Sequence, residues 1–312
     1  MLKDFLGYAH HDYAISLKEF GEPRKLPNCG GWILVRAISG TPYKDAMGCY
    51  PLFSCRNWER LHEDLEQVGP DLVSLSLVTD PLSGVDPAYL NRCFDFVKPF
   101  KTHYIIDLIR PLESFIGKVH RKNARKTLEL MDVEICMEPA EYLDEWIKLY
   151  ENLISKHNMK GINAFSPECF KIQLAMPGMV MFLARREREI IGATLVLKQE
   201  KAAYFHLSAF TSEGYKIRAS YGTHWAALVY GLEKGIRYFN LGGTAGIKED
   251  PKDGLGEFKR GWSNEYRTAY FCGRIFDHDK FKLLCQLYTI SDVEYFPPYR
   301  SAERAKSGVY AF

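Results

Sequence analysis

The sequence predicts an α/β protein with two domains in tandem, each built around a mixed β-sheet. Short β-branched or aromatic stretches at 179–184, 190–197 and 202–210 alternate with charged turns, which is typical of antiparallel strands joined by hairpins. A helical pattern at 221–234 then leads to an apolar stretch at 237–242, which favours a strand returning parallel to the last one. Residues 31–108 show a similar rhythm, a weak internal repeat of element order that indicates a second, related unit.

Length and composition indicate a soluble globular protein. A chain of 312 residues is long enough for two domains of about 150 residues each. The hydrophobic content of 46% and charged content of 26% are ordinary, and a net charge of +2 argues against a protein that coats nucleic acid. No apolar run reaches the length of a membrane helix, and the N-terminus lacks a signal-peptide pattern. The eight cysteines show no zinc-type spacing, so we expect reduced thiols, no metal site and a cytoplasmic location.

Composition divides the chain into four predicted segments. Residues 1–28 are polar and punctuated by glycine and proline, so they predict a surface arm. Residues 29–130 and 131–290 form the two α/β domains, and 291–312 is a Pro/Ser/Arg-rich tail without predicted structure. The adjacent His10 and His11 favour a solvated pair over a metal site, because neighbouring side chains diverge.

In the first domain, apolar stretches predict four strands and two helices. The stripe Trp58, Leu61, Leu65 and Val68 indicates one helix, and Asp86-Pro87 opens another. The strands are expected at 32–38, 46–54, 72–78 and 103–108.

A strongly basic helix is predicted within residues 111–130. Five cations recur at helical spacing on one broad face: Lys118, Arg121, Lys122, Arg125 and Lys126. Like charges on one face cost stability, so a polyanion facing them is plausible, and a solvated linker helix is the alternative.

The second domain begins with a short strand at 133–137 and an amphipathic helix at 141–156, whose apolar face indicates core packing. The meander, helix and return strand follow. Residues 244–256 form a polar loop that is long for a simple connection, so a role in lining a cleft or closing it as a lid is expected. An alternating strand at 265–276 and a helix near 281–288 complete the pattern.

The loop before the helix at 221 carries the clearest binding signal. Unpaired backbone N–H groups at a helix N-terminus favour an anion, usually phosphate. Lys216, Arg218, Ser220 and Thr223 add donors in the same place. A plain connection with capping residues is the alternative.

This order of elements resembles the acyl-CoA-binding half of the GNAT N-acyltransferase superfamily, in which the loop before this helix holds the pyrophosphate of coenzyme A. In place of a glycine-rich loop, this chain has residues 214–222. The resemblance implies contacts to acyl-CoA from Lys216, Arg218, Ala219, Ser220, Gly222 and Thr223.

Three further segments, 120–126, 238–243 and 258–262, occur in the order found in the Fem family of aminoacyl transferases and in related tandem-GNAT acetyltransferases. The similarity spans about residues 30–276. It implies transfer of an acyl or aminoacyl group to an amine, which needs a proton acceptor and a donor for the oxyanion.

The Fem resemblance assigns the catalytic candidates. Lys259 matches the lysine that meets the reacting carbonyl or the donor phosphate, with a surface lysine as the alternative. Asp107 matches a strand-end carboxylate that accepts or orients the amine, with a helix cap or an ion pair to Arg110 as the alternative. Glu257 and His206 are held in reserve for the catalytic roles. The candidates for substrate binding are Arg121, Arg125, Tyr204 and His206.

Four functions follow from these features. An acyl-CoA-dependent acyltransferase is favoured, because the net charge is small and the helical hairpin that some Fem members use for transfer RNA is missing. An aminoacyl-tRNA-dependent enzyme would use the basic helix and act on a cell-wall precursor. The others are a non-catalytic ligand-binding module and, on the basic helix alone, a nucleic-acid-binding protein. The acceptor is an amine-bearing small molecule or a cell-envelope precursor.

Overall fold

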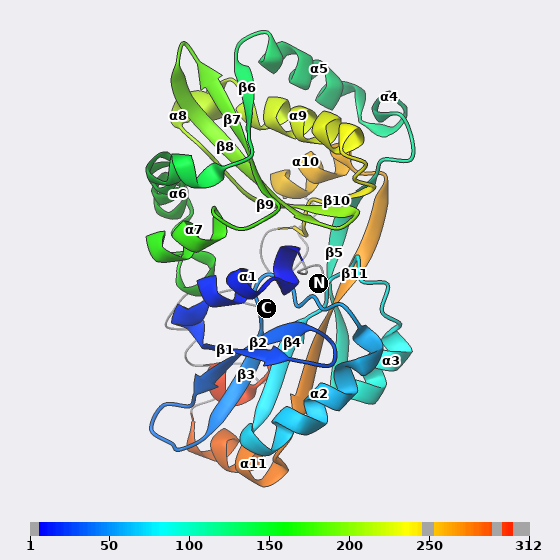
Figure 1. Ribbon diagram of the computed structural model, residues 1–312, viewed down its shortest axis with the longest axis vertical. Helices are drawn as coiled ribbons and strands as arrows, with labels where there is room; N and C mark the ends of the chain where they lie inside the picture. Colours follow the sequence, from blue (N-terminus) through cyan, green and yellow to red (C-terminus); the bar gives the residue numbers. More distant parts are fainter. Residues whose placement is uncertain (1–5, 245–252, 289–294, 302–312) are drawn as a thin grey trace. The chain divides into compact units, whose positions relative to one another are not determined.

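The computed structural model describes residues 6–244, 253–288 and 295–301 (Figure 1). The chain divides into two compact units. Unit 1 comprises Met1–Lys101, Lys160–Phe165 and Thr268–Phe312, and unit 2 comprises Thr102–Met159 and Ser166–Arg267. Unit 2 therefore begins near residue 102 rather than at 131, because the basic helix packs against a helix of the second sheet.

Unit 1 contains a mixed sheet with the strand order β1-β2-β3-β4-β11. The pairing of β3 with β4 is parallel, and the other pairings are antiparallel. The helices and strands of unit 1 are α1 (His11–Ser16), β1 (Glu22–Leu26), β2 (Gly31–Ala37), β3 (Lys44–Gly48), α2 (Leu61–Val68), β4 (Ser74–Val78), α3 (Pro87–Cys93), the last part of β11 (Glu265–Ile275) and α11 (His278–Leu287). Strand β3 is shorter than the sequence pattern indicates and ends before Pro51, which has no N–H to donate to a ladder.

Described residues near both ends of unit 1 have structure that the sequence did not predict. The expected surface arm instead supplies α1 and β1, and it buries Tyr8, Tyr13 and Leu17. The hydroxyl group of Tyr13 donates to the Tyr50 carbonyl oxygen at 2.6 Å. The prediction of a surface arm is wrong because polar composition hid a few large apolar anchors. At the other end, Arg300 in the expected structureless tail is buried and ion-paired to Asp45.

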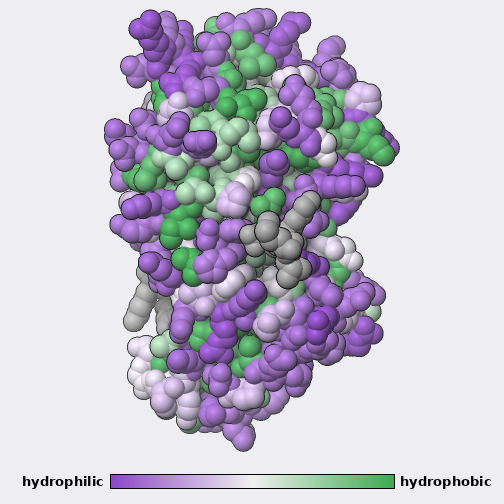
Figure 2. Space-filling model, viewed as in Figure 1, coloured by the Kyte–Doolittle hydropathy of each residue, from purple (hydrophilic) through white to green (hydrophobic). Residues whose placement is uncertain are grey.

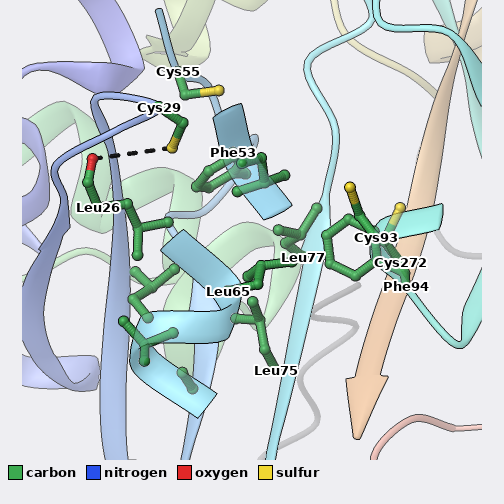
Figure 3. Packing of buried hydrophobic residues seen from close by; sticks show 14 of the residues in the cluster. Leu26, Cys29, Phe53, Cys55, Leu65, Leu75, Leu77, Cys93, Phe94 and Cys272 are labelled. Carbon is green, nitrogen blue, oxygen red and sulfur yellow. Dashed lines mark hydrogen bonds between the residues drawn. The ribbon is translucent and has the colours of Figure 1, made fainter. Parts of the chain in front are cut away.

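The core of unit 1 gathers aliphatic and aromatic side chains together with four cysteines (Figure 3). Cys29 and Cys55 lie beside Phe53, and Cys93 and Cys272 lie beside Phe94. All eight cysteines of the chain are free and seven are buried. Burial raises the pKa of Cys55 well above its usual value, so this thiol stays protonated.

Unit 2 contains the predicted meander and parallel return strand, in the order β5-β10-β9-β8-β7-β6. Among the described strands of unit 2, only β10 and β9 pair in parallel. The elements of unit 2 are the last part of β5 (Phe96–Asp107), α4 (Leu112–Phe115), α5 (Lys118–Leu128), β6 (Asp132–Cys136), α6 (Leu143–His157), α7 (Pro167–Gln173), β7 (Met179–Arg186), β8 (Glu189–Gln199), β9 (Ala202–Phe210), α8 (Ser212–Lys216), α9 (Ala219–Glu233), β10 (Tyr238–Asn240), α10 (Gly254–Trp262) and the start of β11. The mixed sheets confirm the α/β fold class.

Helices cover both faces of the sheet in unit 2. Neighbouring residues of a strand point to opposite faces. Phe205 of β9 stacks on His224 of α9, whereas His206 contacts Gln173 of α7. Helix α9 therefore lies on one face and α7 on the other, and α5 packs on the α9 side (Figure 1). Among the described helices, none is long and apolar enough to cross a bilayer.

Candidate active site

Strands β9 and β10 part within the sheet of unit 2. Their parallel ladder joins Ala202–Tyr204 to Tyr238–Asn240 and ends there. Beyond Tyr204, β9 continues alongside β8 as far as Phe210. Beyond Asn240, the chain stays with β5, because the Leu241 N–H donates to the Tyr104 carbonyl oxygen at 2.9 Å. The two strands thus diverge, and residues after position 204 on β9 lose their neighbour on that side.

A group of aromatic rings surrounds His224 where the strands part. The imidazole of His224 stacks on Phe205, the first residue of β9 beyond the ladder, with ring centroids 4.3 Å apart. Phe258 and Trp262 of α10 lie 5.0 and 5.8 Å from the same ring. His224 Nδ1 is buried without a partner at hydrogen-bonding distance, and the nearby Ser220 carbonyl oxygen already accepts the Thr223 hydroxyl.

Two of the segments that carried the Fem resemblance pack directly against each other. The Gly117 N–H, before α5, donates to the Gly261 carbonyl oxygen at 2.9 Å. His120 Nε2 donates to the Phe258 carbonyl oxygen at 2.9 Å. A Cβ atom at position 261 would lie 2.0 Å from the His120 ring, so only glycine fits there. His120 Nδ1 is consequently the nitrogen that carries the lone pair.

The sequence suggested that Lys259 lies at the start of a strand, but the structure places it on helix α10. Asp253 caps α10 by accepting the N–H groups of Leu255 and Gly256. Lys259 Nζ donates to the Gly243 carbonyl oxygen at 2.5 Å, on the chain just after β10. Its neighbours on α10, Phe258 and Trp262, contact His224 of α9, so Lys259 lies on the α9 side of the sheet where the strands part.

The N-terminus of α9 begins earlier than the sequence indicates. The expected loop contains α8, and α9 starts at Ala219 after Arg218, whose backbone is left-handed with φ of 61°. Lys216 and Arg218 are exposed there, and Arg218 Nη1 donates to the side-chain oxygen of Asn123 on α5 at 3.3 Å. The N–H groups of the first turn have no acceptor within their own helix, so this end can bind an anion.

Two residues that the resemblance assigned to coenzyme A have packing roles instead. A Cβ atom at Gly222 would lie 2.5 Å from Met131, so this glycine lets α9 approach α5 closely. Thr223 is fully buried, and its hydroxyl is shared between Thr194 Oγ1 at 2.9 Å and the Ser220 carbonyl oxygen. We therefore leave both residues out of the donor site. Ala219 is also buried, so it offers only its backbone.

Asp107 does not lie beside Lys259. Its carboxylate accepts two hydrogen bonds from Arg237, at 3.2 and 3.1 Å, and one from the Ile109 N–H. Burial alone would raise the pKa of Asp107, but these bonds bring it below its usual value, which makes the carboxylate a weak base. Asp107 pairs with Tyr238, whereas Lys259 is bonded at Gly243, about 16 Å further along the extended chain. The partner that the sequence suggested, Arg110, is replaced by Arg237.

Tyr204 and His206 alternate on the face of β9 opposite Phe205. His206 is hydrogen-bonded to Gln173 at 3.1 Å, and burial lowers its pKa to about 3. Tyr204 is buried and lies opposite Asn240 in the ladder. These two candidates are therefore separated from His224 and Lys259 by the sheet.

The basic face predicted for α5 is present in the structure, and it points away from α9. Ala124 and Thr127 are the buried residues of this helix. The Arg125 side chain is 78% exposed beside Glu129, at a distance of 3.9 Å. Arg121 is half-buried, and its Nε has no partner among the described residues. Glu257, the reserve candidate, is exposed on α10.

Sequence reasoning missed His120 and His224. His120 lies inside a segment that carried the Fem resemblance, so its position was a usable signal. His224 has no such signal, because a histidine within an apolar helix is ordinary. No group of three His, Cys, Asp or Glu residues converges on a metal position in the part of the chain that the structure describes.

His224 predicts an acid sensitivity of the fold. Burial, reinforced by the charge of Lys259, lowers its pKa to about 3 from the usual 6.5. The unfolded chain therefore binds more protons between these values, and the free energy of unfolding should fall by about 2 kcal/mol between pH 7 and pH 5 from this residue. Urea unfolding of the wild type and of His224→Phe at both pH values checks this. If the unfolding free energy fell equally in both proteins, His224 would not be the cause of the acid sensitivity. Because His206 is present in both proteins, its contribution cancels in the comparison.

The comparisons with known proteins agree with this arrangement. The family model of the acetyltransferase (GNAT) domain matches residues 117–260, which contain α5, the meander, α9 and most of α10. Residues 117–260 of the chain therefore form a GNAT domain. The protein is an acyltransferase, and it moves an acyl or aminoacyl group.

Solved structures of GNAT-fold proteins extend the likeness over most of the chain. FemX aligns with a TM-score of 0.66 at 12% identity, covering 88% of this chain and 93% of FemX. The C-terminal domain of a putative lysylphosphatidylglycerol synthetase from Agrobacterium fabrum aligns at 0.60 with 14% identity, covering 85% and 86%. L-PGS from Bacillus licheniformis aligns at 0.54 with 15% identity, covering 88% and 94%. At these identities the likeness shows the fold. Comparison with curated proteins gives no match.

Proposed function

We propose that this GNAT protein transfers an acyl group from acyl-CoA to an amine where β9 and β10 part. The observation that carries the proposal is Lys259, whose Nζ is held at the Gly243 carbonyl oxygen beside the N-terminal half of α9. A fixed ammonium group at this point stabilises an oxyanion that develops on the acyl carbonyl.

The reaction follows from the chemistry of a thioester. The lone pair of the amine attacks the carbonyl carbon, and the carbonyl oxygen becomes the oxyanion. As the carbonyl re-forms, the C–S bond breaks and the thiolate of coenzyme A leaves. The attacking nitrogen loses one proton, and the departing sulfur takes one up.

We propose His120 in place of Asp107 as the acceptor of the amine proton. Its Nε2 is fixed by the Phe258 carbonyl oxygen, so Nδ1 offers a lone pair. Burial lowers the pKa of His120 below 6.5, so the ring is neutral at pH 7 and able to accept a proton. Asp107 is held by Arg237 at the other end of β10.

The donor would be held at the start of α9. The exposed cations Lys216 and Arg218 flank the first turn, where the N–H groups of Ala219 and Ser220 face the pyrophosphate. This site uses four of the six positions that the resemblance implied, and it leaves out Gly222 and Thr223.

Calorimetry with a non-reactive acyl-CoA analogue tests the donor site. The double variant Lys216→Ala/Arg218→Ala should bind about 10- to 100-fold more weakly than the wild type, because each charge-assisted contact to a phosphate is lost. Lys201→Ala/Lys234→Ala is the matched control, since both lysines are exposed near the other end of α9. Equal loss in the two variants, or no binding by the wild type, would contradict an acyl-CoA donor at α9.

A second donor, aminoacyl-tRNA, is favoured by one observation. The basic face of α5 adjoins the N-terminus of α9 through the contact between Asn123 and Arg218. Two similar structures are described as a putative lysylphosphatidylglycerol synthetase and as L-PGS. These descriptions support an aminoacyl group as a candidate donor group and a cell-envelope component as a candidate acceptor. Incubating the protein with acetyl-CoA or with charged transfer RNA, each beside a panel of amines, distinguishes the two donors.

A further inference from the structure

Helix α5 and the loop before α4 carry a surface that the proposed reaction does not use. On α5, Ala124 and Thr127 are buried, and Lys118, Lys122, Arg125 and Lys126 are exposed. At 100° per residue these four cations form one arc on the side of the helix opposite the buried residues. The face is therefore presented outward from unit 2.

The charge of this face is almost uncompensated. In the described residues, the only ion pair from this helix joins Arg125 to Glu129 at 3.9 Å, and both side chains are exposed. Lys118, Lys122 and Lys126 form no ion pair with any described residue. Like charges at i, i+4 oppose one another, so the face is complementary to an anionic partner.

Exposed aliphatic side chains accompany the cations. Val119, on the first turn of α5, is 66% exposed, and Ile109, just before α4, is 69% exposed. Leu130, just after α5, is 50% exposed. In the view of Figure 2, hydrophilic and apolar surface alternate over the end of unit 2 where α4 and α5 lie. Basic side chains flanked by exposed aliphatic ones are typical of a helix that lies on a lipid surface.

We propose that α5, with Ile109 before α4, docks unit 2 on an anionic lipid surface. The cations contact the lipid headgroups, and Ile109 and Val119 enter the boundary between headgroups and acyl chains. A nucleic acid would satisfy the charges but leave the aliphatic side chains unused, since proteins bind its bases through aromatic rings and hydrogen bonds. The proposal rests on the acyl-CoA donor, because an aminoacyl-tRNA donor would occupy the same basic face of α5.

Sedimentation of the full chain with vesicles tests the proposal. Vesicles of equal parts phosphatidylcholine and phosphatidylglycerol should bind the protein, and vesicles of phosphatidylcholine alone should not. Each cation contributes about fivefold to such binding, so Lys122→Glu/Lys126→Glu should weaken it by at least about 20-fold. Ile109→Ser/Val119→Ser should also weaken it. Lys148→Glu/Lys171→Glu, on α6 and α7, makes the same charge change at exposed sites and should bind as the wild type does.

Other outcomes overturn the proposal and leave the proposed reaction standing. Equal binding by the α5 variant and the α6/α7 control would show that net charge, and not this face, is responsible. Displacement from vesicles by inorganic phosphate would indicate a site for a free anion. Binding of a transfer-RNA mixture, lost in Lys122→Glu/Lys126→Glu and unaffected by Ile109→Ser/Val119→Ser, with no vesicle binding, would identify RNA as the partner. Each variant is checked by its thermal unfolding, and its transfer of acyl groups from acyl-CoA to a water-soluble amine should be unchanged.

Discussion

Replacing Lys259 by methionine should lower kcat/KM for acyl transfer by about 100- to 1,000-fold, the usual cost of removing one donor to an oxyanion. Methionine keeps the length and the apolar stem but removes the charge that Lys259 holds at the Gly243 carbonyl oxygen. Steady-state kinetics on the variant measure the loss. Lys259→Arg keeps a positive charge in a different shape and should recover part of the activity.

Arg260→Met is the matched control, since Arg260 is the exposed neighbour on α10. A structural role for Lys259, tying α10 to the chain after β10, would lower the unfolding temperature and weaken donor binding. A catalytic role lowers kcat and leaves the affinity for an acyl-CoA analogue near that of the wild type. Undiminished kcat/KM in Lys259→Met would remove Lys259 from the mechanism, and donor binding without any transfer in the wild type would favour a non-catalytic binding module.

Asp45→Ala should destabilise unit 1 by about 3–5 kcal/mol, because it leaves buried positive charge without its partner. Asp45 is fully buried on β3 and accepts hydrogen bonds from Arg300 at 2.8 and 2.9 Å and from Arg36 at 3.0 and 3.3 Å. The Tyr299 hydroxyl adds a further contact at 3.3 Å. Urea unfolding followed by circular dichroism gives the change in free energy.

Asp71→Ala is the control for this measurement. Asp71 forms an exposed ion pair with Arg24 at 3.2 Å, and such pairs contribute about 1 kcal/mol or less. A loss at Asp45 no larger than that at Asp71 would mean that solvent reaches Arg300 and Arg36 once the carboxylate is gone.

The local pattern of the chain predicted most of unit 2. Hairpin turns of charged residues and the apolar face of the helix at 143–157 are local signals, and the structure confirms both. Helix α10 was missed because glycines at 254, 256 and 261 weaken its helical pattern. The β1 strand and the link between Asp45 and Arg300 depend on partners distant in the sequence, which no local window contains. The lid expected at 244–256 falls largely on 245–252, outside the described residues.

The candidate site was predictable only in part. Lys259 came from the Fem resemblance and not from any local pattern. The exclusion of Gly222 and Thr223 follows from the close packing of α5 on α9, and the pairing of Asp107 with Arg237 joins residues far apart in the chain. His120 and His224 gain their character from burial among rings of α9, α10 and β9, which sequence spacing cannot supply.

The segmental make-up of unit 1 bears on how the protein is made in the cell. Unit 2 draws on Thr102–Met159 and Ser166–Arg267, so its whole sequence is synthesised before the last segment of unit 1. Strand β4 pairs with Phe271–Ile275, and Asp45 awaits Arg300. Unit 1 therefore begins first on the ribosome but receives its last segment only at the end of synthesis. Until then β4 lacks its β11 neighbour, and Asp45 lacks Arg300, one of its two arginine partners. Nascent chains that end before Thr268 contain the whole sequence of unit 2 but lack the last segment of unit 1, and the open edge of β4 is then a surface on which chaperones can act.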